Sequence, residues 1–374
     1  MGHRPPGLGA PPGGQSAGGN DVYRAQLVGA TGYGGLGMIE QLLRHPEIKL
    51  TSLLAKTDVG KPVSDFFPHL RGFCDQVVED SSPERIGQDA DVVIFSTPDR
   101  VGMAYAPQLV GSGVKMIDYS GDFRFGSIAD YQEYARRHPG TAGREHASPD
   151  LIGKAVYGVP ELYRERLRGA SLVGNPGCFA VAMILALAPA VKAGLVDISS
   201  IIVDGKTGSS GAGKKPGPVH HYPERNENVT PYRIASHQHN VEVVQTLSRL
   251  AGGQVTLTFV PHVVPATRGI LCTCYASFSP GATLAQAREA YAAFYSGEPF
   301  VRLMPSSVIP TLKSVYTSNF CDIGLAADES AGKLIVISAI DNLVKGQAGV
   351  ALQNINLMLG LPETMGLDRA PTYP

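Results

Sequence analysis

One cysteine stands where an apolar strand gives way to a helix. Residues 172–179 read LVGNPGCF, in which a Pro-Gly turn separates a short strand from a long apolar helix that we expect to begin near Cys178. The positive end of a helix stabilises a thiolate, which would lower the pKa of this thiol and raise its reactive fraction. We therefore predict that Cys178 is a nucleophile; an inert, buried cysteine is the alternative.

Two histidines could handle the protons that such a nucleophile needs. His237 and His239 precede a segment with helical spacing, residues 241–250, for which Asn240 is a suitable N-cap. We predict that one of the two is a general acid/base, and the sequence leaves the choice between them open. A pair of histidines one residue apart also occurs in metal sites, but no third ligand stands at metal spacing, so no metal is predicted.

A glycine-rich turn between a strand and a helix is typical of dinucleotide sites. Residues 29–35 read GATGYGG, after an apolar strand at 23–28 and before a helix expected at 37–44. Such glycines let backbone N–H groups approach a pyrophosphate at the positive end of the helix. The spacing is GxxGxxG rather than the commoner GxGxxG, and a plain glycine turn is the alternative. The predicted cofactor contacts are Gly29, Thr31, Gly32, Tyr33, Gly34 and Gly35.

The end of the second strand indicates which dinucleotide binds. An NAD enzyme usually carries a carboxylate there for the ribose hydroxyls, whereas residues 53–58 read LLAKTD, with no carboxylate before Asp58. A small residue, a cation and a hydroxyl suit a 2'-phosphate, so we predict NADP(H) with Lys56 as a contact; a solvated loop lysine is the alternative. Ser96 and Pro98, at the end of a later core strand, are expected to support the cofactor.

A glycine-serine loop completes the candidate residues. Residues 205–215 (GKTGSSGAGKK) are rich in backbone donors that could hold a phosphate or an oxyanion, although the loop lacks the Walker spacing; a mobile loop over the cleft is the alternative. A cysteine nucleophile beside a nicotinamide suggests that a thioester forms and hydride then reduces it to an aldehyde.

The strand and helix pattern that must position these residues is α/β. Strands at 23–28, 50–55, 91–96 and 114–119 alternate with helices, including one at 102–111, which predicts a Rossmann-like, doubly wound parallel sheet. Longer strands at 199–203, 254–261, 270–278 and 333–340 predict a second, α+β domain with a mostly antiparallel sheet. Residues 342–361 have helical spacing and are expected to return to the first domain.

The predicted domains are a disordered leader at 1–20, an NADP-binding domain at 21–172 and 341–374, and a catalytic domain at 173–340. Among 374 residues 43% are hydrophobic and 17% charged, as in a globular protein, and the net charge of -1 favours a small-molecule substrate over nucleic acid. The apolar runs are too short to span a membrane. Five cysteines without a CxxC pair favour a reducing, cytoplasmic location.

Together these segments resemble the N-acetyl-gamma-glutamyl-phosphate reductase family, from about Tyr23 to Gly366. The motifs that carry the resemblance are GATGYGG (29–35), DYSGDFR (118–124), YGVPEL (157–162), GNPGCF (174–179), TGSSGAG (207–213), NENVTPYRIASHQHNVE (226–242), RGIL (268–271) and SAIDNLVKGQAGVALQNINLMLG (338–360). They stand in the family's order.

The resemblance implies roles for matched positions. Cys178 would attack an acyl phosphate and expel phosphate, NADPH would reduce the thioester, and His239 or His237 would act as general acid/base in this step of arginine biosynthesis. Asn342 would touch the cofactor, and the second domain would make a homodimer or homotetramer. Substrate contacts would come from Arg124, Asn175, Ser209, Gly211, Gly213 and Glu242.

Departures from the family pattern are few, and rival functions remain. Asn240 and Val241 stand where Thr-Pro is common, Lys214 where Arg is common, and Gly37 lies early in the first helix. The rivals are the lysine-pathway reductase that acts on a carrier-bound aminoadipyl phosphate, aspartate-semialdehyde dehydrogenase, and a non-catalytic NADP-binding protein. The NENVTPY segment favours the arginine enzyme.

Overall fold

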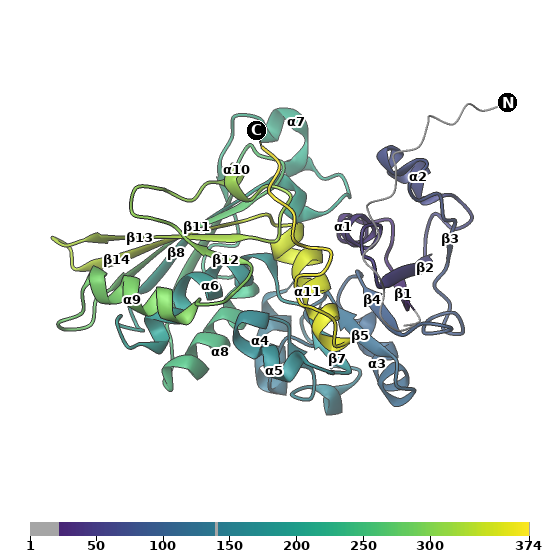
Figure 1. Ribbon diagram of the computed structural model, residues 1–374, viewed down its shortest axis with the longest axis horizontal. Helices are drawn as coiled ribbons and strands as arrows, with labels where there is room; N and C mark the ends of the chain where they lie inside the picture. The colour runs from purple at the N-terminus through teal and green to yellow at the C-terminus, as the bar shows by residue number, and fades with distance from the viewer. Residues whose placement is uncertain (1–21, 139–140, 374) are drawn as a thin grey trace, which may run out of the picture.

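The structure is a computed structural model that describes residues 22–138 and 141–373. The leader predicted at residues 1–20 lies outside the described residues. Figure 1 shows two sheets with helix α11 (Gly349–Met358) between them. In this arrangement, segments that follow strands of both sheets meet in one region, where the candidate residues lie.

The first sheet is parallel throughout, in the order β3-β2-β1-β4-β5-β7-β6. Its strands are β1 (Tyr23–Val28), β2 (Ile48–Ala55), β3 (Val78–Asp80), β4 (Val92–Phe95), β5 (Lys115–Asp118), β6 (Val156–Tyr157) and β7 (Leu172–Gly174). The predicted doubly wound sheet is therefore confirmed. Strand β7 extends two residues past the boundary predicted at 172, and the division into domains stays a prediction.

Helices cover both faces of this sheet, which explains why its strands are apolar at successive positions. On one face Leu27 and Ile94 pack with residues of α1 (Tyr33–Leu42) and α11. On the other face Val93 and Phe95 pack with α3 (Gly102–Gly111) and α4 (Ile128–Arg137). The return of the last helix to this sheet agrees with the pattern in residues 342–361.

The second sheet is mixed, in the order β12-β13-β14-β11-β8-β10-β9, and four of the six pairings between its described strands are antiparallel. Its strands are β8 (Ile201–Thr207), β9 (Thr230–Pro231), β10 (Leu257–Val263), β11 (Ile270–Ser277), β12 (Val301–Leu303), β13 (Cys321–Asp328) and β14 (Lys333–Ile340). Helices α6 (Cys178–Lys192), α8 (His239–Ala251) and α9 (Leu284–Phe294) lie along one side of it (Figure 1).

Several elements were not predicted. Strands β12 and β13 and helix α9 are absent from the sequence expectations, as are α5 (Pro160–Leu167) and the short helices α2 (Val63–Phe66), α7 (Tyr222–Arg225) and α10 (Leu312–Val315). Helix α1 begins four residues before its predicted start, because Gly32 is its N-cap and the last two glycines of the turn are already helical. Elements of three or four residues carry weak periodicity, which is why the sequence pattern misses α2, α7, α10 and β12.

Candidate active site

Residues from both sheets' connections line one cleft of about 630 Å³. Five segments contribute to its wall: the start of α1, the turn at residues 174–178 that carries Cys178 (the nucleophile turn), the glycine-serine loop, the histidine pair and the segment before α11. Ten of the predicted site residues line this cleft: Tyr33, Gly34, Arg124, Cys178, Ser209, Gly211, Gly213, His237, His239 and Asn342. The fold thus joins residues as far apart in the chain as Tyr33 and Asn342.

Cys178 is the first residue of α6, with Gly177 as the N-cap, so its predicted place at a helix start is confirmed. The predicted direction of its pKa is wrong. Burial raises the pKa of the Cys178 thiol to about 11, although the N–H of Phe179 and the nearby Arg124 pull it down. The desolvation of a charged sulfur therefore outweighs the Phe179 N–H and the charge of Arg124, even though the half-buried side chain borders the cleft. The thiolate must be favoured by a base or by a bound ligand.

The structure distinguishes the two histidines. His239 lies against the nucleophile turn, since a Cβ added to Gly177 would fall 2.4 Å from its Nε2. His237 packs among Phe179, Tyr232 and Phe259, and its Nδ1 accepts the N–H of His239 at 3.2 Å. The His237 side chain therefore supports the first turn of α8, while His239 faces the residue next to the thiol.

Helix α8 begins at His239, so the prediction that Asn240 caps this helix is wrong. Asn240 is the second helical residue, and its Nδ2 donates to the carbonyl of Leu257 at 3.3 Å. Burial lowers the pKa of both His237 and His239 well below the usual range, assisted by Arg124 for His239. A histidine that is neutral at neutral pH can accept a proton from the thiol.

A buried ion pair lies behind the nucleophile turn. Arg124 donates from Nη1 to Glu242 at 2.9 Å, from Nε to the carbonyl of Asn175 at 2.7 Å and from Nη2 to the carbonyl of Tyr119, so all three guanidinium nitrogens are bonded within the protein. The other oxygen of Glu242 accepts the hydroxyl of Tyr157 at 2.8 Å and the N–H of Gly177 at 3.0 Å. Glu242 has no exposed surface, which suits an orienting role rather than direct substrate contact.

Asn175 is likewise enclosed by the protein. Its Nδ2 donates to the carbonyl of Gln347 at 3.1 Å, and its Oδ1 accepts from Asn354 at 3.3 Å. Only 1% of Asn175 is exposed, and it does not line the cleft. Its bonds tie the nucleophile turn to the segment before α11.

The glycine turn has the shape that a dinucleotide requires. Gly29 has φ of 89°, and a Cβ there would lie 2.3 Å from the carbonyl oxygen of Ser96, so only glycine fits. Gly35 would meet the carbonyl oxygen of Gly29 at 2.4 Å, which explains how the helix packs closely on the turn. These close contacts leave Tyr33 and Gly34 facing the cleft. The turn and the α1 N-terminus therefore fit a pyrophosphate.

The other predicted cofactor residues surround this turn without lining the cleft. Ser96 touches it, because a Cβ on Gly34 would lie 2.5 Å from the Ser96 hydroxyl. Lys56 and Pro98 are exposed beyond the ends of β2 and β4. Because its side chain is exposed, Lys56 is accessible to a 2'-phosphate. The predicted residues outside the cleft lining are Gly29, Thr31, Gly32, Gly35, Lys56, Ser96, Pro98, Asn175 and Glu242.

Asn342 holds the glycine-serine loop. Its Oδ1 accepts the N–H of Gly269 at 2.7 Å, and its Nδ2 donates to the Ser210 hydroxyl at 3.1 Å. Lys214, at the end of the same loop, places its ammonium 4.5 Å from the centroid of Phe67, which packs in the core beside the first sheet. The loop therefore reaches from the second sheet to the cofactor side of the cleft.

Sequence reasoning missed several residues of the site. Arg225, His138 and Gly346 line the cleft, although none stood among the candidates. Tyr157 and the buried Lys345 belong to motifs that were recognised only as landmarks. Their roles depend on contacts with distant segments, for which a single sequence carries no local signal.

The described residues contain neither a metal-binding cluster nor a membrane-spanning helix. No group of three or more His, Cys, Asp or Glu side chains is placed to hold a metal ion there. No helix within residues 22–138 and 141–373 is both long and apolar enough to cross a bilayer.

Family models match both halves of the chain. Residues 24–170 match the semialdehyde dehydrogenase NAD-binding domain, and residues 178–342 match the semialdehyde dehydrogenase dimerisation domain. A thiol at a helix start, a histidine and a dinucleotide turn in one cleft define, with these matches, a semialdehyde dehydrogenase. The chain belongs, more narrowly, to the N-acetyl-gamma-glutamyl-phosphate reductase family.

The assignment to this family rests on curated relatives. The chain is 46% identical to the N-acetyl-gamma-glutamyl-phosphate reductase of Symbiobacterium thermophilum and 43% identical to that of Geobacter metallireducens, each over 94% of this chain and 100% of the relative.

Solved structures support the fold. Aspartate semialdehyde dehydrogenase II from Vibrio cholerae is similar with a TM-score of 0.68 at 19% identity, over 91% of this chain and 99% of that one. The Candida albicans aspartate semialdehyde dehydrogenase solved with NADP gives a TM-score of 0.63 at 16% identity, over 92% of this chain and 99% of that one.

Proposed function

We propose that this protein reduces N-acetyl-gamma-glutamyl phosphate to N-acetyl-L-glutamate 5-semialdehyde with NADPH, releasing phosphate, in arginine biosynthesis. The observation that carries the proposal is that Cys178, at the start of α6, shares one cleft with the dinucleotide turn and with His239. The identity of the substrate as N-acetyl-gamma-glutamyl phosphate is inferred from relatives that are named for this substrate and match 94% of the chain. Neither the carrier-bound lysine-pathway substrate nor a non-catalytic role has comparable support.

The first chemical step forms a thioester. His239, neutral because burial lowers its pKa, accepts the thiol proton of Cys178, and the sulfur attacks the acyl carbon. The bond from this carbon to the phosphate oxygen breaks, and phosphate leaves with the electron pair. Arg124 lines the cleft beside the thiol, and its charge favours the thiolate that attacks.

The second step releases the aldehyde. NADPH, when bound, supplies the hydride that reduces the thioester carbonyl. Collapse of the resulting adduct breaks the carbon–sulfur bond, and His239 returns a proton as Cys178 leaves. Glu242 and Asn175 hold the nucleophile turn in place during both steps through their bonds to Gly177 and Gln347.

The assay that tests this function follows NADPH formation from N-acetylglutamate 5-semialdehyde and phosphate. Phosphate-dependent NADPH formation with the wild type supports the proposal. Activity only with carrier-bound aminoadipate semialdehyde would instead identify the lysine-pathway reaction. Bound NADP without turnover of either aldehyde would favour a non-catalytic protein.

The charge of the cleft fits an anionic substrate. Arginine and histidine side chains line it, and none of the described lining residues is Asp or Glu. One of these arginines, Arg225, is buried, with 8% of its surface exposed. Its Nη2 donates to the Thr230 hydroxyl at 2.8 Å. Its Nε finds no partner among the described residues. We assign this guanidinium to the α-carboxylate of the substrate.

Replacing Arg225 with glutamine is expected to raise the KM for N-acetylglutamate semialdehyde by about 10- to 100-fold, because a charge-assisted hydrogen bond is lost. The KM for 4-acetamidobutanal, which lacks only the α-carboxylate, should not change. Steady-state kinetics with both aldehydes measures the difference. An equal rise for the two substrates would show that Arg225 shapes the loop and does not bind the carboxylate.

The oligomer is part of the proposal. Along β8, β11 and most of β14, every second side chain points to the face of the second sheet opposite α6 and is only partly buried or exposed. Some of these side chains are apolar, such as Ile202, of which 47% is exposed. Because this region matches a dimerisation domain, we propose that a second copy covers the face. Sedimentation velocity should give a mass above that of one 39.5 kDa chain, and a monomer would count against it. With all five cysteines free, we propose a cytoplasmic location.

A further inference from the structure

Lys345 is a fully buried cation in the π-helical turn η5 (Val344–Ala348), directly before α11. Its ammonium donates to Glu161 in α5 at 2.6 Å and to the amide oxygen of Gln353 in α11 at 2.8 Å. Glu161 is also buried, with 1% of its side chain exposed. A buried ion pair is costly to desolvate, so its presence calls for a role beyond stability.

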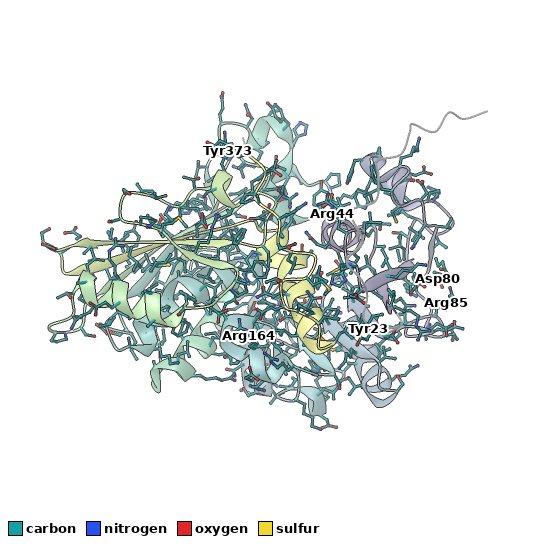
Figure 2. The ribbon with its side chains drawn as sticks, viewed as in Figure 1. Tyr23, Arg44, Asp80, Arg85, Arg164 and Tyr373 are labelled. Carbon is teal, nitrogen blue, oxygen red and sulfur yellow. The ribbon has the colours of Figure 1, made fainter. Side chains whose placement is uncertain are left out.

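The pair is fixed in turn by a wider network. The amide of Gln353 donates to Glu363 at 2.7 Å, and Glu363 accepts from Arg164 at 2.7 Å. Arg164, labelled in Figure 2 where α5 approaches α11, also forms a bidentate pair with Glu298. These contacts hold the ammonium of Lys345 in one position.

The turn that contains Lys345 separates the nucleophile from the cofactor turn. A Cβ on Gly346 would lie 2.8 Å from the Cβ of Cys178, so the backbone of η5 packs directly on the cysteine. The next residue, Gln347, accepts from Asn175 at 3.1 Å, and a Cβ on Gly34 would lie 2.9 Å from its Nε2. A shift of η5 therefore changes the distance between the thiol and the dinucleotide turn.

The partner of Lys345 belongs to a segment that also holds the other side of the site. Tyr157, four residues before Glu161, donates its hydroxyl to Glu242 behind the nucleophile turn. Between them, the carbonyl of Gly158 accepts from Asn354 at 2.9 Å. Residues 157–161 thus fasten both the histidine side and the η5 side of Cys178.

We propose that Lys345 and Glu161 are positioning residues, whose buried ion pair fixes η5 so that the Cys178 thioester lies at hydride-transfer distance from the nicotinamide. The proposal rests on the function proposed above, since it concerns the geometry of that reaction. Neither side chain lines the cleft, and both act through the backbone at Gly346 and Gln347.

The double variant Lys345→Met/Glu161→Met is the informative change. Removing Lys345 alone leaves a buried unpaired carboxylate and endangers folding, whereas replacing both charges by apolar side chains of similar volume is commonly tolerated. Gln353 keeps Asn319 as a donor at 3.0 Å, so no new polar group loses its last partner there. Thermal unfolding and NADPH fluorescence titration establish that the variant folds and binds the cofactor.

Two readouts are expected to move in opposite directions. The kcat should fall about 10- to 100-fold while KM stays within about threefold, because an error near 1 Å in the reacting geometry is costly. The rate at which iodoacetamide alkylates Cys178 should rise, because a looser η5 admits water and lowers the raised pKa of the thiol. Mass spectrometry of the Cys178 peptide separates this reaction from the four buried cysteines.

The control is Arg302→Met/Asp322→Asn, which removes another ion pair with a buried carboxylate, 2.6 Å long and away from the cleft lining. It should leave kcat and alkylation within about twofold of the wild type. Unchanged kcat and alkylation in the Lys345/Glu161 variant would overturn the proposal, as would parallel loss of stability, NADPH binding and turnover. Failure of the proposed function would appear differently, as a wild type without turnover.

Discussion

Cys178→Ser is expected to lower kcat/KM by a factor of about 10,000 or more, because a serine hydroxyl cannot replace the thiolate in thioester formation. The helix that begins at this residue should persist, since the next 13 residues, 179–191, are all buried in the core of the second domain. Phosphate-dependent NADPH formation measures the loss, and fluorescence titration should show NADPH affinity unchanged.

The matched control is Cys74→Ser, a buried cysteine in the core of the first domain. Its activity should remain close to that of the wild type if only the cleft cysteine reacts. Substantial turnover by Cys178→Ser would remove the covalent mechanism. The pH dependence of alkylation adds a second check: because burial raises the pKa of Cys178 to about 11, the alkylation rate of the free enzyme should still increase above pH 9.

His239→Asn is expected to reduce kcat by about 100- to 10,000-fold, the usual contribution of a general acid/base. His237→Asn should cost less than about tenfold, because an Asn oxygen can still accept the N–H that His237 Nδ1 receives from His239. Steady-state kinetics of the two variants therefore decides between residues that the sequence treats alike. Equal losses, or a larger loss for His237, would contradict the assignment.

The pH dependence of wild-type kcat/KM shows in which direction the pKa of His239 is shifted. Burial lowers the pKa of His239 well below that of a free imidazole, so the basic form persists as the pH falls through the ordinary histidine range. The acid limb of kcat/KM should accordingly lie below the ordinary histidine range. An acid limb centred on the ordinary histidine value would indicate that the imidazole is not desolvated in the working enzyme.

Local pattern was sufficient for most of the fold. Strand β1 and helix α3 have the predicted bounds, and β14 does as well, because glycines mark an end of each. The short strand β12 lacks that pattern, since three residues are too few for a period to show. Asn240 failed as a cap because the side chain of His237 takes the N–H that opens α8.

The sequence by itself determined the chemistry that is available: a thiol at a helix start, a histidine pair and a glycine turn that admits a dinucleotide. These follow from residue type and near neighbours, and only glycine tolerates the backbone at Gly29. The tertiary structure alone decided that His239 rather than His237 faces the nucleophile turn, that burial raises the pKa of Cys178, and that Lys345 is buried beside Glu161. Desolvation and ion pairing depend on which distant segments pack together, and no local spacing encodes that packing.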